Sequence, residues 1–309
     1  MKPNCSAVIP VYNGEKSIES LVSRLTPVMQ TLFNKFEIIL VNDGSLDKSW
    51  GIISNFTKNN PHITAINLHR NYGQHNALLC GIRAAKFEYT LTMDDDLQHP
   101  PEEIYKLLAA MQNGYDVVYG IPNKMPHSSW RNFFSKYVKL ILARLMGIAR
   151  VRDISSFRLF RTDLREAFMD FNSPNVIVDA LLSWSTTNFG TTIVQESPRP
   201  LGESNYTFLK LVKMSLLILT GFSTVPLRFA SLVGFSFTVF GIFILIYVIV
   251  RFLNVGSIPG FPFLASIITI FCGTQLFALG IFGEYLAHIF EHSTARPPYV
   301  IKNQVSKEK

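Results

Sequence analysis

Short apolar runs alternate with helical patterns along the first part of the chain. The segments 6–10 and 36–41 are continuous apolar runs, as expected for strands that are covered on both faces. Between them, residues 16–32 carry apolar side chains at helical spacing. Further strands are expected at 63–68, 89–93 and 116–119, and further helices at 74–85 and from Pro100 onward. This alternation predicts an α/β fold with a Rossmann-like, mostly parallel sheet flanked by helices.

The pattern changes after this region. Residues 132–148 are expected to form a basic amphipathic helix, and strands at 156–160 and 191–196 are expected to flank a helix at 175–186. Another amphipathic helix is expected at 206–222, and its lysines favour a position on a membrane surface. We expect the tail after Arg296 to be disordered.

Two uncharged apolar runs, 229–250 and 263–282, lie near the C-terminus. A helix of either length reaches roughly 30 Å, the thickness of the hydrocarbon core of a bilayer. Two buried helices of a soluble protein would need polar positions that are missing here. Basic residues flank the pair, so the positive-inside rule places both termini in the cytoplasm. The expected divisions are a cytoplasmic head domain at 1–205, an amphipathic juxtamembrane helix at 206–228, a transmembrane hairpin at 229–290 and a cytoplasmic tail at 291–309.

The 309 residues carry a formal net charge of +7. A basic balance can indicate a nucleic-acid partner or an anionic membrane surface. Lys210, Lys213 and Arg228 lie just before the first apolar run, which favours the membrane, and we expect no nucleic-acid partner. The three cysteines lack metal-ligand spacing and are expected to be reduced thiols, as in a cytosolic head domain.

Three consecutive carboxylates, Asp94, Asp95 and Asp96, follow an expected strand. Strand alternation would place Asp94 and Asp96 on one face, with Gln98 continuing it and Asp95 pointing away. Oxygen ligands of this kind suit Mg²⁺ or Mn²⁺, often shared with a substrate phosphate. The alternative is capping of the helix that begins at Pro100. The carboxyl ends of parallel strands bind ligands in open α/β sheets, which favours a metal site.

Two more turns at strand ends carry polar side chains. Asp43 follows the second strand and can accept hydrogen bonds from a ribose or a base, although an ordinary βα turn has the same composition. The first strand ends at Pro10, and the turn after it offers the ring of Tyr12 and the carboxylate of Glu15.

The segments VIPVYNGE, VNDGSLD, RNYGQHNALLCGI and MDDDLQHPPE occur in this order. With them the chain resembles family 2 glycosyltransferases of the GT-A fold. Within that family it is similar to polyprenyl-phosphate glycosyltransferases, which include dolichyl-phosphate mannose synthase and bacterial glucosyl enzymes with two C-terminal spans. The segment FGEYLAHIFEHSTARPPY is typical of the bacterial branch.

The resemblance implies a nucleotide site in the head domain. Pro10, Tyr12 and Glu15 would line the base and the ribose of the nucleotide. Asp43 would bond the base, and Asp94 would lie near the ribose and the metal.

The resemblance also implies a metal and a set of catalytic positions. Asp94, Asp96 and Gln98 would bind the Mg²⁺ or Mn²⁺ that bridges the diphosphate. The remaining implied positions are Arg131 and Ser135 for the sugar donor and acceptor phosphate, Arg199 for the phosphates, and Asp153 near the sugar as an orienting group or a base.

The implied activity is an inverting, metal-dependent transfer of a hexose from a nucleotide sugar to a polyprenyl phosphate. We prefer UDP-glucose as donor and undecaprenyl phosphate as acceptor, because the resemblance is to bacterial two-span forms. It places the chain in the bacterial plasma membrane and leaves homo-oligomerisation open. Alternatives are a GDP-mannose-dependent mannosyltransferase and a non-catalytic membrane scaffold. A processive polysaccharide synthase is disfavoured, because the chain lacks the QxxRW signature and the additional spans of those enzymes.

Overall fold

The computed structural model describes residues 2–122, 155–197, 225–255, 260–294 and 296–306. The helices expected at 132–148 and 206–222 lie outside these residues. Contacts within the chain separate two units, which are described in turn: Met1–Asn205 with Ala295–Lys309, and Tyr206–Thr294.

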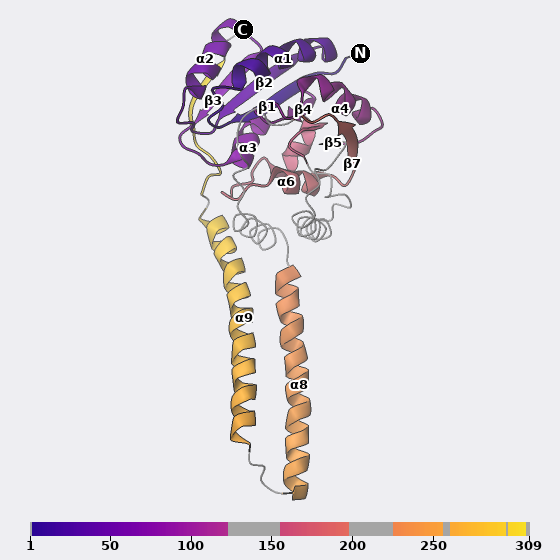
Figure 1. Cartoon of the computed structure of the whole chain (residues 1–309), viewed down its shortest axis with the longest axis vertical. Helices are drawn as coiled ribbons and strands as arrows, with labels where there is room; N and C mark the ends of the chain where they lie inside the picture. Colours follow the sequence, from indigo (N-terminus) through magenta and orange to yellow (C-terminus); the bar gives the residue numbers. More distant parts are fainter. Residues whose placement is uncertain (1, 123–154, 198–224, 256–259, 295, 307–309) are drawn as a thin grey trace. The chain divides into compact units, whose positions relative to one another are not determined.

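The first unit is built on one mixed sheet, which has eight strands among the described residues (Figure 1). The strand order is β7-β5-β6-β4-β1-β2-β3-β8. Strands β1 to β4 run parallel, as do β5 and β7, whereas β6 and β8 are antiparallel to their neighbours. The bounds are Cys5–Val11 (β1), Phe36–Asn42 (β2), Ile63–Leu68 (β3), Tyr89–Thr92 (β4), Val117–Pro122 (β5), Arg158–Arg161 (β6), Phe189–Val194 (β7) and Ile301–Ser306 (β8). The expected mostly parallel sheet is confirmed.

Helices cover both faces of this sheet. As a result, β1, β2 and β3 are buried at every position. Ala7 and Ile9 of β1 belong to a core that includes residues of α1, α2 and α4, whereas Val8 belongs to a second core with residues of α3, α6 and η3. The bounds are Ile18–Leu32 (α1), Ser49–Asn59 (α2), Gln74–Ala84 (α3), Pro101–Glu103 (η1), Ile104–Met111 (α4), Thr162–Phe168 (η3) and Val178–Ser185 (α6).

The strand order reverses at β1, which lies between β2 and β4. The chain passes from β1 to β2 on one side, while β4 begins the other half of the sheet. In open α/β sheets the crevice beyond the carboxyl ends of such a strand pair is the usual ligand site. The turns after β1, β2 and β4 carry Tyr12 and Glu15, Asp43, and the three carboxylates, so the fold brings these predicted site residues to this edge.

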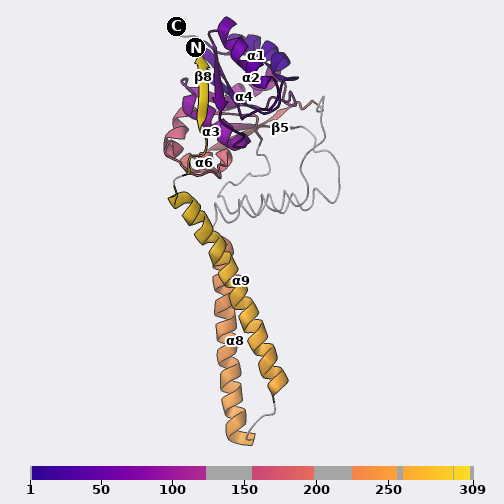
Figure 2. The same ribbon diagram turned by 90° about the vertical axis from the view of Figure 1, so that its left-hand side faces the viewer.

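The described residues of the C-terminal tail, 296–306, belong to the first unit and end in a strand, so the disorder expected for them is wrong. Residues 301–306 form β8, which pairs with β3 (Figure 2). Tyr299 packs against the second core, its hydroxyl lies 3.4 Å from Arg83 Nη1, and the guanidinium lies over its ring at 5.7 Å. All six residues of β8 are exposed. The strand therefore forms by backbone pairing at a sheet edge. Because none of its side chains is buried, its sequence does not alternate between apolar and polar residues.

The second unit contains α8, Val225–Val255, and α9, Phe261–Ser293. Each includes a segment that is long and apolar enough to cross a membrane, Pro226–Arg251 and Ile270–Ala287. The two helices contact each other, with the rings of Phe237 and Phe271 edge to face at 5.7 Å. Large apolar side chains are exposed along both helices, as expected for surfaces that face lipid. The two expected apolar helices are confirmed.

Candidate active site

A cavity of about 750 Å³ opens where the turns after β1, β2 and β4 meet. Its volume lies in the usual range for small-molecule sites. The turn after β1 contributes Tyr12 and Glu15, the turn after β2 contributes Asp47, and the turn after β4 contributes Asp95 and Asp96. Three of the side chains predicted from the sequence, those of Tyr12, Glu15 and Asp96, therefore share one cavity.

Hydrogen bonds join the turn after β1 to the turn after β2. The side-chain oxygen of Asn13 accepts the N–H of Leu46 at 2.9 Å, and Asn13 has the left-handed backbone that asparagine tolerates, with φ of 54°. Glu15 donates its N–H to Asp47 Oδ2 at 3.1 Å, and its carboxylate accepts the N–H of Lys48 at 3.2 Å. These bonds fix one wall of the cavity.

Asp43 joins the end of β2 to the start of α3. Its two carboxylate oxygens accept the N–H groups of Tyr72 at 2.7 Å and Gly73 at 2.8 Å. Burial raises the pKa of Asp43, and the two hydrogen bonds oppose that rise. Pro10 is buried within β1 and is not among the residues that line the cavity. Contacts of Asp43 and Pro10 with a nucleotide stay predictions.

Gly44 is required in the turn that follows Asp43. Its φ is +63°, a conformation that residues with a side chain rarely adopt. A Cβ at this position would lie 2.3 Å from the carbonyl carbon of Arg70, so the turn packs directly against the backbone before α3.

The three consecutive carboxylates lie in a turn, and this corrects the expected arrangement. Strand β4 ends at Thr92, so strand alternation does not extend through the carboxylates. Asp95 and Asp96 both line the cavity. A Cβ added at Gly14 would lie 2.2 Å from Asp95 Oδ2, which shows that Asp95 reaches the turn after β1. The expectation that Asp95 points away from the site is therefore wrong.

Asp94 is held by two side chains that the sequence did not single out. Gln74 Nε2, at the first residue of α3, donates to Asp94 Oδ1 at 2.6 Å. Ser156 Oγ, shortly before β6, donates to Asp94 Oδ2 at 2.7 Å. The segment RNYGQHNALLCGI contains Gln74, but an amide at a helix start gives no signal of its own in a sequence.

The carboxylates after β4 are electrostatically crowded. Burial raises the pKa of Asp94, and the neighbouring charge of Asp96 adds to this, while the hydrogen bond from Ser156 opposes it. Burial and the charges of Asp94 and Asp96 raise the pKa of Asp95 to about 7. Gln98 continues the turn: its N–H donates to Asp96 Oδ1 at 3.1 Å. Such a cluster favours a bound cation, which would relieve the repulsion.

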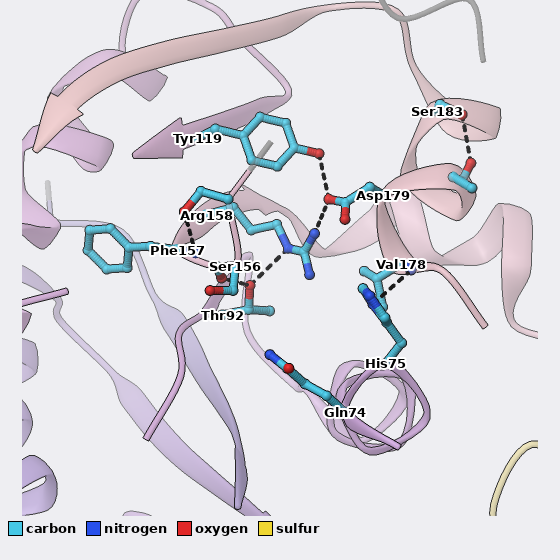
Figure 3. Close-up of polar contacts among 12 residues, drawn as sticks. Gln74, His75, Thr92, Tyr119, Ser156, Phe157, Arg158, Val178, Asp179 and Ser183 are labelled. Carbon is cyan, nitrogen blue, oxygen red and sulfur yellow. Dashed lines mark hydrogen bonds and ion pairs between the residues drawn. The ribbon is translucent and has the colours of Figure 1, made fainter. Parts of the chain in front are cut away.

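A buried polar network surrounds Arg158 (Figure 3), and its neighbour Ser156 bonds Asp94. Arg158 of β6 forms an ion pair with Asp179 of α6, and the hydroxyl of Tyr119 donates to Asp179 Oδ1 at 2.9 Å. Arg158 Nε also donates to Thr92 Oγ1 at 2.9 Å, at the end of β4. The sequence contains one signal for this network, an arginine within the apolar strand FRLF, because a buried arginine requires acceptors.

Four predicted site residues lie outside the described residues: Arg131, Ser135, Asp153 and Arg199. Their roles stay predictions.

Residues 6–168 match the family described as Glycosyl transferase family 2. The undecaprenyl-phosphate 4-deoxy-4-formamido-L-arabinose transferase of Proteus mirabilis (strain HI4320) is 35% identical over 311 residues, which cover 98% of this chain and 94% of that protein. The transferase of the same name from Shewanella sediminis (strain HAW-EB3) is 34% identical over 303 residues, which cover 96% of this chain and 91% of that protein.

Solved structures show the same fold at low sequence identity. Mannosyl-3-phosphoglycerate synthase from Rubrobacter xylanophilus has a TM-score of 0.51 at 12% identity, over 70% of this chain and 72% of that chain. Glucosyl-3-phosphoglycerate synthase from Mycobacterium tuberculosis, in complex with Mn²⁺, UDP and glucosyl-3-phosphoglycerate, has a TM-score of 0.51 at 15% identity, over 71% of this chain and 78% of that chain. The family match and the full-length relatives agree: the chain belongs to glycosyl transferase family 2 and is a glycosyltransferase with the GT-A fold.

Proposed function

We propose that this enzyme transfers a sugar from a nucleoside diphosphate donor to undecaprenyl phosphate, with inversion at the anomeric carbon. The observation that carries the proposal is the acidic cavity at the carboxyl ends of β1, β2 and β4, in a chain with two membrane-length helices. This combination suits a water-soluble donor and a lipid acceptor. The names of the full-length relatives support undecaprenyl phosphate as the acceptor.

A divalent cation fits the residues at the donor site. The ligands that we propose, Asp94, Asp96 and Gln98, are oxygen donors, as Mg²⁺ and Mn²⁺ prefer. Among the described residues no group of three or more His, Cys, Asp or Glu side chains forms a closed metal site. We propose that one or two of these carboxylates hold the cation and that substrate phosphates complete its coordination. The cation would neutralise charge on the departing diphosphate.

The remaining roles in the proposal belong to the protein and the acceptor. Tyr12 and Glu15 line the cavity and are assigned to the nucleotide. Arg199 is assigned to the diphosphate, and Arg131 with Ser135 to the acceptor phosphate. A phosphate monoester has a second pKa near 6 and is largely dianionic at pH 7. It therefore requires little activation, and we assign Asp153 an orienting role.

Two sugars are supported by different observations. The sequence motifs favour glucose carried by UDP, as in the bacterial two-span glucosyl enzymes. The two full-length relatives described above carry the name of 4-deoxy-4-formamido-L-arabinose. The two donors differ in the substituents that the cavity has to recognise, so a direct comparison of the two will assign the substrate.

We also propose a location. The head domain at 1–205 and both termini would lie in the cytoplasm, with the juxtamembrane helix at 206–228 on the membrane surface and the hairpin at 229–290 across the plasma membrane. Glycosylation-site mapping or cysteine labelling of the loop between α8 and α9 tests this orientation: the loop should be modified only from the far side.

The experiment that tests the function uses the full-length protein in detergent with undecaprenyl phosphate. Each radiolabelled donor, UDP-glucose, UDP-4-deoxy-4-formamido-L-arabinose or GDP-mannose, is supplied with Mn²⁺ or with EDTA, and lipid-linked product is separated by thin-layer chromatography. We expect product from one UDP-sugar, none with EDTA, and none from Asp96→Asn, which removes a metal ligand with little change of shape. Absence of lipid-linked product from every donor would refute the proposed transfer to undecaprenyl phosphate.

A further inference from the structure

We propose that Gln74 and Ser156 are positioning residues of the donor site, which hold the carboxylate of Asp94 in the orientation that the metal and the diphosphate require. The proposal rests on the proposed function, because it concerns the metal end of the same site. It assigns a role to two residues that have none in the family resemblance described above.

The contacts of Asp94 carry the first step. One oxygen accepts Gln74 Nε2 at 2.6 Å and the other accepts Ser156 Oγ at 2.7 Å. One donor precedes Asp94 in the sequence, at the start of α3, and the other follows it, in the segment before β6. A carboxylate with a donor on each oxygen cannot turn about its Cβ–Cγ bond without losing one of them. Each oxygen keeps a second lone pair for another ligand.

The second step concerns what holds Ser156. Its carbonyl oxygen accepts the hydroxyl of Thr92 at 2.7 Å, and the same hydroxyl accepts Arg158 Nε at 2.9 Å. Arg158 is 1% exposed and is fixed by its ion pair with Asp179 (Figure 3). A set of hydrogen bonds therefore runs from α6, through Arg158 and Thr92, to Ser156 and the carboxylate of Asp94, whose neighbours Asp95 and Asp96 line the cavity.

The third step asks why this interior position holds an ion pair. A buried ion pair is no more stabilising than well-packed apolar side chains of the same volume, because both charges lose their hydration. Stability alone therefore gives no reason for Arg158 and Asp179. Their donors and acceptors end at Thr92 and Ser156, next to the donor site, and a directional function accounts for polar groups at this position. Carboxylates that bind metals are commonly oriented by such outer hydrogen bonds, and losing one typically lowers metal affinity or activity by about 10- to 100-fold.

The test uses the full-length protein and measures Mn²⁺ binding in the presence of UDP by electron paramagnetic resonance, together with melting temperature. The variants are Gln74→Ala and Ser156→Ala, with Ser156→Thr as the conservative change that keeps the hydroxyl. Matched controls remove the same groups elsewhere: Gln112 is exposed at the end of α4, and Ser54 is on α2, with its hydroxyl bonded to Gly51 O. Asp96→Asn serves as the reference for loss of the metal site.

We expect Gln74→Ala and Ser156→Ala each to weaken Mn²⁺ binding about 10-fold or more, with the melting temperature close to that of the wild type. Ser156→Thr should bind Mn²⁺ as the wild type does, and Gln112→Ala and Ser54→Ala should change neither quantity. Turnover should fall in the two alanine variants even at saturating donor, because the misplaced carboxylate also affects the transition state.

Three outcomes would overturn the proposal, and they are distinguishable. If Asp96→Asn loses Mn²⁺ but Gln74→Ala and Ser156→Ala bind it normally, the positioning role is wrong and the metal site of the proposed function stands. If Asp96→Asn also binds Mn²⁺ normally, the metal site is wrong and the positioning role fails with it. A lower melting temperature with unchanged Mn²⁺ affinity would make both residues structural, which likewise refutes the proposal.

Discussion

Replacing Arg158 by methionine should strongly destabilise the first unit. The side chains of Arg158 and Asp179 are 1% and 9% exposed, so the substitution leaves a buried carboxylate that still accepts the hydroxyl of Tyr119 but has lost its cation. Breaking a buried ion pair from one side costs about 3–5 kcal/mol. For a unit of this size, each kcal/mol lowers the melting temperature by about 2–4 °C. Arg158→Met should therefore lower the melting temperature by about 6–20 °C.

Tryptophan fluorescence gives a selective assay. Trp50, Trp130 and Trp184, the three tryptophans of the chain, belong to the first unit, so emission reports its unfolding in the full-length protein in detergent. The double variant Arg158→Met with Asp179→Asn removes both charges and keeps an acceptor for the Tyr119 hydroxyl. It should recover about half or more of the lost stability, as a coupled pair requires. A loss below about 1 kcal/mol in Arg158→Met, or simple additivity in the double variant, would refute this account.

Three further predictions follow from burial and backbone geometry. Burial lowers the pKa of His75 below 6.5, so the folded state binds its proton less tightly than the unfolded state. Stability should therefore be full above about pH 6.5 and fall on acidification. In His75→Asn the midpoint of denaturation should fall less as the pH is lowered. Burial raises the pKa of Cys80 to about 12, and Tyr299 packs beside it. In a Cys272→Ser background, Tyr299→Ala should accelerate alkylation of Cys80. An unchanged alkylation rate would contradict the packing. Gly44→Ala should cost more than the 1–2 kcal/mol of a left-handed backbone, because its Cβ meets backbone atoms at 2.3 Å, and denaturant titration would show this.

The sheet could be predicted because its strands are recorded in local pattern. The run expected at 36–41 is β2, Phe36–Asn42, and the run at 63–68 is β3. Burial on both faces requires continuous apolar residues, and few other structures of this length produce them. The strand expected at 191–196 begins earlier, at Phe189, because only Gly190 and Val194 of β7 are buried and its apolar pattern is therefore weak.

The last strand could not be predicted for the opposite reason. The sequence IKNQVS has only two apolar residues, Ile301 and Val305, and all six residues are exposed. Its stability comes from main-chain hydrogen bonds to β3 and from Tyr299, which packs just before it. Neither contact is local in sequence, since β3 and β8 are separated by most of the chain. A tail without hydrophobic periodicity can therefore be ordered when its backbone pairs with the edge strand of a sheet.

For the carboxylates after β4, the sequence predicted the segment but not the directions of its side chains. The sequence predicted a ligand site at this segment, and the structure places Asp95 and Asp96 in the lining of a cavity. It assigned their directions by strand alternation, which fails because the strand stops at Thr92 and Leu97 takes a left-handed φ of 59°. In that turn Asp95 reaches Gly14, which has no Cβ to obstruct it, whereas Asp94 is held by Gln74. Identical side chains thus differ in their chemistry through what lies opposite them, and these neighbours come from segments that only the folded sheet brings together.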